Sequence, residues 1–331
     1  MRTTNCSFKF FVIILVLLFA TSSIQAADKK ISARADVKEF IDSMVKKHNF
    51  DRKSLNALMD QAHIKEKIIS AISRPAEAKP WYKYRPIFVT QKRIKKGVEF
   101  WNKHRADLER AEKIYGVPPE IITAIIGVET YYGKHTGGYR VIDSLSTLAF
   151  GYPKRSKFFT SELEHFLLMA REEKMDPLTL MGSYAGAMGK PQFISSSFRS
   201  YAVDFDGDGK RDLWNNTTDA IGSVGNYFKR HGWKQGDSVV HKATITGNQY
   251  KALAEKGLKP HTSVKEFLKK GVSTAHDLQK NQKASLITLD QKNGQDYWLG
   301  LNNFYVITRY NHSPLYAMAV YQLGQKIQEL R

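Results

Sequence analysis

Residues 116–130 read GVPPEIITAIIGVET, and this segment predicts a helix that is buried on nearly every side. Pro118 and Pro119 suit the first turn of a helix, where a missing backbone N–H leaves no bond unmade. Apolar side chains then occupy most positions from 121 to 128, as in a helix inside a core. Glu129 ends the run, and burial against apolar walls would raise its pKa so that it can donate a proton near neutral pH. The alternative is that Glu129 simply reaches solvent from the helix end.

The composition indicates a large folded protein with an anionic partner. The chain has 331 residues, of which 42% are hydrophobic and 12% aromatic, enough for a large core and two or three subdomains. Its formal net charge of +19 indicates nucleic acid, an acidic membrane surface or an acidic wall polymer as partner, although many exported bacterial proteins are simply basic. No nucleic-acid-binding motif is recognised. We therefore expect no nucleic-acid partner, and we expect a monomer.

The N-terminus has the pattern of a secretory signal. Two basic residues precede an apolar run over residues 10–20, and small and polar residues follow as far as Ala26. Eleven apolar residues are too few to span a bilayer, so residues 1–26 predict a signal peptide that is cleaved, with a retained anchor as the alternative. The single cysteine, Cys6, lies ahead of the apolar run, where a lipid-anchor cysteine would not stand, and cleavage removes it. We expect a soluble periplasmic protein without disulfides or a stable membrane span.

Beyond the signal, most of the chain has helical patterning. Apolar residues at helical spacing predict an N-terminal helical subdomain over residues 27–79, in which Asp51 is an N-cap. Residues 80–86 read PWYKYRP, which predicts an extended aromatic linker with Tyr84 as a candidate for stacking on a sugar ring. Amphipathic spacing also predicts a helix over residues 158–171.

After residue 235 the pattern changes from helical to strand-like. Short runs within residues 239–246 are strand candidates, and residues 286–299 give a hairpin signal around an Asn-Gly pair. Residues 304–308 predict a further strand, and residues 315–330 predict a closing helix. The expected fold class is therefore mainly α (α+β), with a small antiparallel β insertion.

Residues 204–212 read DFDGDGKRD, the first half of an EF-hand loop. The twelfth position holds Asn215 instead of the usual glutamate, but Asp219 follows four residues later at the start of the next helix. Three carboxylates at alternate positions repel one another without a cation, which favours Ca2+ over a metal-free Asp/Gly turn. The expected ligands are Asp204, Asp206, Asp208, the backbone carbonyl of Lys210, and Asp219.

Residues 182–193 read GSYAGAMGKPQF, which is too rich in small residues to fill a core. Such a segment permits close backbone approach, either by another helix or by a ligand. Ser183 and Gln192 could then offer hydrogen bonds to a polar substrate.

Four motifs in this order resemble the membrane-bound lytic transglycosylase B family of peptidoglycan-cleaving enzymes; they span residues 127–133, 182–193, 204–219 and 303–313. The resemblance implies a lysozyme-like helical core with an EF-hand-like calcium loop, in which Ca2+ is structural. Helices from both chain ends are expected to pack beside this core. The implied parts are the core over 80–235, a small β-containing subdomain over 236–309, and a cleft segment with the C-terminal helix over 310–331.

By the same resemblance, Glu129 is the sole catalytic acid and base. It protonates the β-1,4 glycosidic oxygen between N-acetylmuramic acid and N-acetylglucosamine, while the muramoyl N-acetyl group stabilises C1. Glu129 then deprotonates O6 of that sugar, which closes a 1,6-anhydro ring without water. The implied substrate-binding residues are Ser183 at the N-acetyl group, Gln192, Tyr310 and Asn311 near the reacting sugar, and Tyr84, Tyr227 and Tyr316 along the cleft.

The sequence departs from the family pattern at three points. Lys190-Pro191 replaces an aromatic-glycine pair, Ser195 replaces proline, and the calcium loop is one residue longer. Two alternatives remain: a muramidase that uses water, and a non-catalytic, calcium-stabilised wall-binding protein. Most glycosidases need a second carboxylate, and no partner for Glu129 stands out in the sequence, which counts against the muramidase.

Overall fold

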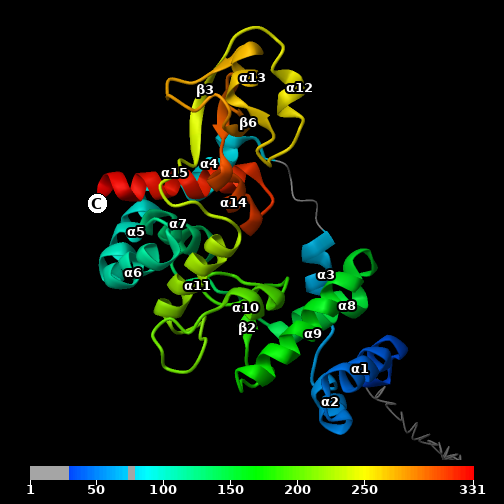
Figure 1. Ribbon diagram of the computed structural model, residues 1–331. Helices are drawn as coiled ribbons and strands as arrows, with labels where there is room; N and C mark the ends of the chain where they lie inside the picture. Colours follow the sequence, from blue (N-terminus) through cyan, green and yellow to red (C-terminus); the bar gives the residue numbers. More distant parts are fainter. Residues whose placement is uncertain (1–29, 74–78) are drawn as a thin grey trace, which may run out of the picture.

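The computed structural model describes residues 30–73 and 79–331. Figure 1 shows a helical body with a smaller lobe, built around β3 and β6, at one side of it. The helices are η1 (Ile31–Ala33), α1 (Ala35–His48), α2 (Arg52–Met59), α3 (Glu66–Ser73), α4 (Trp81–Phe88), α5 (Gln91–Lys103), α6 (Arg105–Tyr115), α7 (Pro119–Thr130), α8 (Val141–Gly151), η2 (Pro153–Arg155), α9 (Ser156–Glu172), α10 (Ser195–Tyr201), α11 (Thr217–Arg230), α12 (Lys251–Ala254), α13 (Val264–Lys269), α14 (Asn302–Tyr310) and α15 (Pro314–Leu330). The strands are β1 (Tyr139–Arg140), β2 (Met181–Gly182), β3 (Val240–Ile245), β4 (Thr262–Ser263), β5 (Val272–Ser273), β6 (Lys283–Asp290) and β7 (Gln295–Gly300).

The predicted central helix is α7, and it is buried along nearly its whole length. It packs against α15, α5, α6 and α11, so other helices surround it. Gly324 of α15 lies so close to α7 that a Cβ there would stand 3.0 Å from the backbone oxygen of Glu120. This packing brings side chains of α7 and of the C-terminal helix α15, which are far apart in the sequence, into one site.

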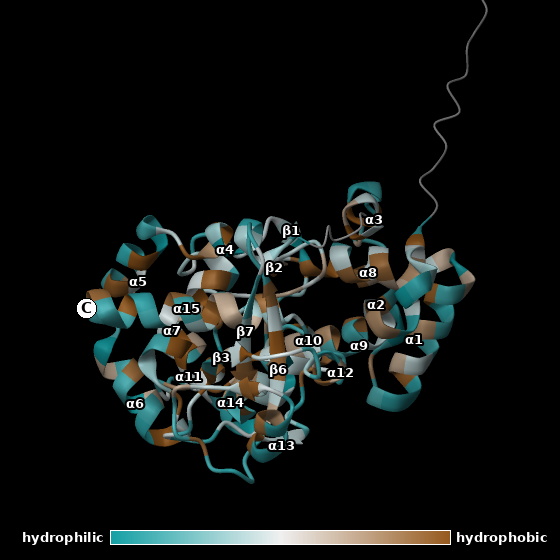
Figure 2. Cartoon of the chain, turned by 90° about the horizontal axis from the view of Figure 1, so that it is seen from above, coloured by the Kyte–Doolittle hydropathy of each residue, from teal (hydrophilic) through white to brown (hydrophobic). Residues whose placement is uncertain are grey.

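The N-terminal helices pack at the other end of the molecule. Phe40 of α1 meets Phe150 of α8 edge to face, with ring centroids 6.0 Å apart. Asp51 caps α2 by accepting the backbone N–H of Ser54, which confirms that predicted N-cap. Figure 2 shows α1, α2 and α8 at one end of the molecule and α5 and α15 at the other. The N-terminal helices therefore lie away from α7, whereas the C-terminal helix lies directly on it.

The smaller lobe contains an antiparallel sheet with strand order β4-β6-β7-β3-β5. The predicted hairpin is confirmed: β6 and β7 pair with Leu286 opposite Leu299, and Gly294 closes the turn with a φ of 92°. Leu286 and Leu299 belong to a small core of the lobe, while the neighbouring Ile287 belongs to the main core. Because successive side chains of a strand face opposite ways, the sheet has its own core on one face and packs against the helical body on the other.

Two predictions of local structure were wrong. The PWYKYRP segment is not extended but forms α4, since Trp81, Tyr84 and Phe88 contact one another at helical spacing. Residues 304–308 are not a strand but part of α14, where Asn303 is buried and its side chain amide donates to the backbone oxygens of Lys234 and Asp237. In both cases tertiary packing outweighs the proline or β-branched residues that argue against a helix.

Within residues 30–73 and 79–331, no helix is both long and apolar enough to cross a membrane. The predicted signal peptide lies outside the described residues.

Candidate active site

Glu129 occupies the last turn of α7 and is partly exposed there. The helix ends because Tyr131 and Tyr132 take left-handed conformations, and their N–H groups bond back to the oxygens of Gly127 and Ile126. The hydroxyl of Tyr316, on α15, donates to Oε1 of Glu129 at 2.5 Å. Burial raises the pKa of Glu129 to about 7, and the Tyr316 hydrogen bond opposes part of that rise. A protonated Glu129 is therefore available near neutral pH, as the sequence predicts.

Tyr84, Tyr310 and Tyr316 lie around Glu129. Burial raises the pKa of each of these phenols, and the charge of Glu129 raises it further. Tyr310 also donates to the backbone oxygen of Pro191 at 2.5 Å. These tyrosines come from α4, α14 and α15, and they remain neutral hydrogen-bond donors instead of acting as bases.

Among the described residues, no second carboxylate contributes to the pKa of Glu129. Its hydrogen-bond partner is a phenol. This arrangement differs from the paired carboxylates of most glycosidases, and it supports a single group acting as both acid and base.

Tyr227 and Asn311 occupy contrasting positions. Tyr227 is 7% exposed and donates its hydroxyl to the backbone oxygen of Arg309 at 2.7 Å. Its ring packs on that of Tyr310 with centroids 4.8 Å apart, so it supports Tyr310. Asn311 is exposed and follows α14 directly, two residues before Ser313, which caps α15.

The segment 182–193 folds back beside the loop that follows α7. A Cβ at Gly137 would stand 2.0 Å from the backbone oxygen of Gly182, so the close approach predicted for these small residues is made by this chain's own backbone. Ser183 accepts the backbone N–H of Ala187 through Oγ at 3.0 Å, which leaves its hydroxyl hydrogen free to donate.

Gln192 links the two loops. It has a left-handed backbone with a φ of 52°, and its amide nitrogen donates to the oxygens of Thr136 and Gly189. Its side-chain oxygen is the group left to accept a hydrogen bond from a ligand.

Lys190, which the sequence analysis noted only as a departure from the family pattern, connects this segment to residues 204–219, here called the aspartate loop. Its N–H donates to the oxygen of Leu213 at 2.8 Å, and its ammonium donates to the oxygen of Trp214 at 2.5 Å. Its own backbone oxygen accepts the hydroxyl of Thr130, the residue after Glu129. A short chain of hydrogen bonds therefore connects the aspartate loop to the end of α7.

In the aspartate loop, Asp204, Asp206 and Asp219 offer carboxylate oxygens that all lie within 4.8 Å of one another. Asp219 is 0% exposed and accepts the N–H groups of Phe205 and Asp212 at 2.7 and 2.8 Å. Burial raises the pKa of Asp219, and the charges of Asp206 and Asp204 raise it further, although these two N–H donors oppose the rise. Such a cluster of hard oxygen ligands fits a divalent cation such as Ca2+.

The structure adds two details about the loop that the sequence analysis did not contain. Asp208 stands outside this three-carboxylate group, and its carboxylate accepts the backbone N–H of Lys210 at 2.8 Å. Asn216, which sequence reasoning missed, caps α11 with its side-chain oxygen and donates to Asp206 at 2.7 Å. An Asn directly before a helical pattern is a signal that could have identified it.

Comparison with known proteins assigns the chain to a family. The model described as "Transglycosylase SLT domain" matches residues 32–325. Membrane-bound lytic murein transglycosylase B of Escherichia coli strain K12 is 48% identical over 302 residues, which cover 88% of this chain and 82% of that protein.

Solved structures give the same result. Catenated lytic transglycosylase SltB1 from Pseudomonas aeruginosa superposes with a TM-score of 0.88 at 52% identity, covering 90% of this chain and 99% of that one. The Escherichia coli lytic transglycosylase Slt35 in complex with calcium superposes with a TM-score of 0.84 at 47% identity, covering 90% and 94%. These matches confirm the predicted mainly helical, lysozyme-like fold with small antiparallel sheets. The chain belongs to the transglycosylase SLT family, and it is a lytic murein transglycosylase.

Proposed function

We propose that Glu129 alone carries the acid and base chemistry of this lytic transglycosylase. The observation that supports this is a partly exposed carboxyl with a pKa near 7, bonded to the Tyr316 hydroxyl and without a neighbouring carboxylate among the described residues. In its protonated form Glu129 gives its proton to the glycosidic oxygen between N-acetylmuramic acid and N-acetylglucosamine. The C1–oxygen bond breaks, and the muramoyl N-acetyl group stabilises the positive charge at C1.

Glu129 then acts as a base. The Glu129 carboxylate, held in place by Tyr316, removes the proton from the muramoyl O6, whose electron pair forms the new bond to C1. The products are a 1,6-anhydro end and a free hydroxyl on the leaving sugar, and Glu129 is protonated again for the next cycle. No water enters the balance, so a single acid–base group suffices.

The remaining cleft residues orient the sugar. Ser183 has a hydroxyl hydrogen to donate to the N-acetyl oxygen, and Gln192 has an amide oxygen to accept from a sugar hydroxyl. Tyr84 and Tyr310 supply flat apolar faces beside the acid, with Asn311 at the exposed edge. Tyr227 acts through Tyr310, because its own hydroxyl bonds to the backbone.

The aspartate loop is proposed to hold a structural Ca2+. Asp204, Asp206 and Asp219 supply the clustered carboxylates, and Asp208 with the Lys210 carbonyl completes the predicted set. Calcium in the related Slt35 structure supports this assignment. When bound, the ion offsets the repulsion among these carboxylates. It takes no part in the reaction, because these residues are distinct from those around Glu129.

Peptidoglycan suits the basic chain, because stem peptides carry carboxylates and the chain has a formal charge of +19.

Cleavage of residues 1–26 would release a periplasmic monomer for cell-wall turnover and remodelling. A molecular mass of the exported protein that corresponds to a start near Ala27 would support this cleavage. The subdomain boundaries near residues 80, 236 and 310 likewise remain a proposal.

Digestion of purified peptidoglycan in water enriched in 18O separates the three candidate functions. The proposed enzyme releases anhydro-ended fragments that contain no 18O. A muramidase places one 18O atom at each new reducing end, and a wall-binding protein releases nothing. Either of the last two results would overturn the proposed reaction.

A further inference from the structure

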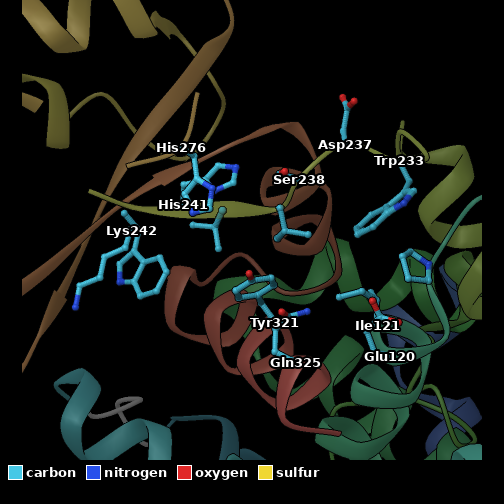
Figure 3. A pocket seen from close by; sticks show the side chains of 14 residues that line it. Glu120, Ile121, Trp233, Asp237, Ser238, His241, Lys242, His276, Tyr321 and Gln325 are labelled. Carbon is cyan, nitrogen blue, oxygen red and sulfur yellow. The ribbon is translucent and has the colours of Figure 1, made fainter. Parts of the chain in front are cut away.

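The two ends of α7 have different surroundings. The first turn borders a pocket of about 360 Å3 where the smaller lobe meets the helical body, and Figure 3 shows Glu120 of α7 and Tyr321 of α15 beside this pocket. At the last turn, which carries Glu129, a tyrosine ring lies between α7 and α5. Contacts at this last turn are the ones that can fix the position of the Glu129 carboxyl.

The chain leaves α7 through three consecutive residues with left-handed backbone. Tyr131, Tyr132 and Gly133 have φ angles of 53°, 63° and 88°. Glycine tolerates this region, but a tyrosine adopts it rarely, because its Cβ crowds the carbonyl oxygen that follows. Among the residues that the structure describes, this is the one place where two adjacent residues other than glycine have positive φ. Such strain persists only where the surrounding contacts over-determine it, and it is concentrated at active sites.

The ring of Tyr132 makes contacts that hold this turn. The three nearest atoms to a Cβ added at Gly127 of α7 all belong to this ring, at 2.7–2.8 Å, and a Cβ at Gly97 of α5 would stand 2.6 Å from its hydroxyl oxygen. The hydroxyl donates to the backbone oxygen of Arg93 at 2.7 Å, and the ring packs on that of Phe100 with centroids 5.6 Å apart. Glycine inside a helix lowers the stability of that helix, so Gly127 indicates that space for the ring has priority over helix propensity.

Arg93 contacts both left-handed tyrosines. Its backbone oxygen accepts the hydroxyl of Tyr132, and its guanidinium lies 5.0 Å from the ring centroid of Tyr131. The guanidinium also lies 5.4 Å from the ring centroid of Phe88 and donates to the backbone oxygen of Ile87 at 2.5 Å. A cation over two aromatic faces is attracted by both. The turn after Glu129 is therefore connected to α5 and to the end of α4.

The same turn sets the surroundings of Glu129. The N–H groups of Tyr131 and Tyr132 bond to backbone oxygens of the last turns of α7, which keeps the helix regular up to Glu129. The hydroxyl of Tyr316 then reaches Oε1 of Glu129 at 2.5 Å from α15. Burial disfavours the charged form of this carboxyl, and so does the negative end of the helix dipole. A looser turn would move the carboxyl away from Tyr316 and admit water to it.

We propose that Tyr132 is a positioning residue for the transglycosylase reaction, because it holds the last turn of α7 in the conformation that presents Glu129 to Tyr316 and to the glycosidic oxygen. This inference rests on the proposed role of Glu129. Tyr132 acts through Glu129 and not on the sugar, since its hydroxyl bonds to a backbone oxygen and its ring is packed between two helices. Its contacts offset the unfavourable backbone conformation of the turn.

Tyr132→Phe tests the proposal, because it keeps the ring between the helices but removes the bond to Arg93. The measurements are kcat, KM and the pH–rate profile on purified peptidoglycan. We expect kcat to fall about five- to tenfold with KM nearly unchanged, as loss of one hydrogen bond that positions the acid predicts. Burial is the larger influence on the pKa of Glu129, so admitting water should move the alkaline limb of the profile to lower pH. Loss of the Tyr316 bond alone would move it to higher pH.

Two further variants complete the test. Tyr250→Phe is the matched control, because it removes a hydroxyl bond to Tyr297 within the smaller lobe and should leave kcat and the profile unchanged. Gly127→Ala places a methyl group against the Tyr132 ring, so kcat should fall and the limb should shift as in Tyr132→Phe, although alanine favours a helix. A wild-type limb near pH 7 that neither Tyr132→Phe nor Gly127→Ala moves would overturn this inference alone. A wild type without that limb would overturn the proposed role of Glu129 instead.

Discussion

Glu129 and Asp219 are both carboxyl groups whose pKa is raised by burial, yet their surroundings differ. Glu129 stands at the end of α7 with one phenol as its partner, and its pKa is about 7. Asp219 stands at the start of α11, accepts two backbone N–H groups, and has Asp204 and Asp206 as close neighbours. A carboxyl with a single donor in an apolar setting can exchange a proton, whereas one held by fixed N–H groups among like charges needs a cation. We therefore propose that the same chemical group supports catalysis in one place and stability in the other.

Among the substitutions that leave Glu129 itself in place, removing the phenol next to it should give the largest effect. Tyr316→Phe keeps the ring but deletes the hydrogen bond that favours the charged form of Glu129. We expect kcat to fall by about 10- to 100-fold, and the pKa of Glu129 to rise, because the group that lowered it is gone. The pH–rate profile measures both. An unchanged profile with lower activity would show that Tyr316 acts through packing instead.

The pH dependence of the wild-type rate tests the difference between Glu129 and Asp219. Catalysis starts from protonated Glu129, so the rate should fall as pH rises through about 7, by about tenfold for each further unit. A rate that holds constant from pH 6 to pH 9 would contradict the role of Glu129 as the acid.

The free energy of unfolding should decrease as Glu129 loses its proton. The pKa of Glu129 is higher in the folded state than the ordinary 4.5, so the folded protein binds the proton more tightly. Its stabilising contribution is complete below pH 4.5 and is lost as pH rises through about 7. Relative to Glu129→Gln, the wild type should therefore lose about 3 kcal/mol over that interval. Denaturant melts of both proteins at pH 5 and pH 8 measure the difference, and a constant difference would contradict it.

At the aspartate loop we expect a change in stability but not in chemistry. Asp219→Asn removes a carboxylate and leaves one of its two N–H donors without an acceptor, which should cost about 1–3 kcal/mol. A chelator should lower the Tm of the wild type but not that of the variant, because an ion bound only to the folded state stabilises it by mass action. Turnover at low temperature should persist in both. Coincident wild-type melting curves with and without chelator would rule out a structural ion.

The smallest effect is expected at Lys190, which connects the aspartate loop to the end of α7 that carries Glu129. Lys190→Met removes the ammonium bond to Trp214 but keeps both backbone bonds of residue 190. We expect a loss of about 1 kcal/mol in unfolding free energy and a fewfold decrease in kcat. Lys190→Arg, which can still donate to that oxygen, is the matched control. Equal losses in the two variants would indicate that the ammonium contact to Trp214 does not matter.

The sequence predicted those parts of the molecule that depend on local patterning. The apolar run of α7, the cap at Asp51 and the β6–β7 hairpin each carry their signal within a few residues, and all three are present. The α4 and α14 helices were missed because prolines and β-branched residues argue locally for extended chain, while distant packing decides.

The site was predicted less completely than the fold. Spacing made Glu129 a candidate acid, with a carboxyl that simply reaches solvent as the alternative. Its bond to Tyr316 joins residues 187 positions apart, and only the family resemblance brought Tyr316 into the cleft. The role of Lys190 depends on backbone oxygens of Leu213 and Trp214, whose positions no side-chain pattern records. The pocket lined by Glu120, Tyr321 and Trp298 could not be predicted either, because α7, α15 and β7 meet only in the folded chain.

The most direct test of the central claim is mass spectrometry of the products that wild type and Glu129→Gln release from purified peptidoglycan. Our account predicts fragments one water lighter than reducing-end muropeptides from the wild type, and none from the variant, which keeps the size of the side chain but has no proton to give. Anhydro fragments released by Glu129→Gln at the wild-type rate would contradict the assignment of Glu129 as the sole acid and base.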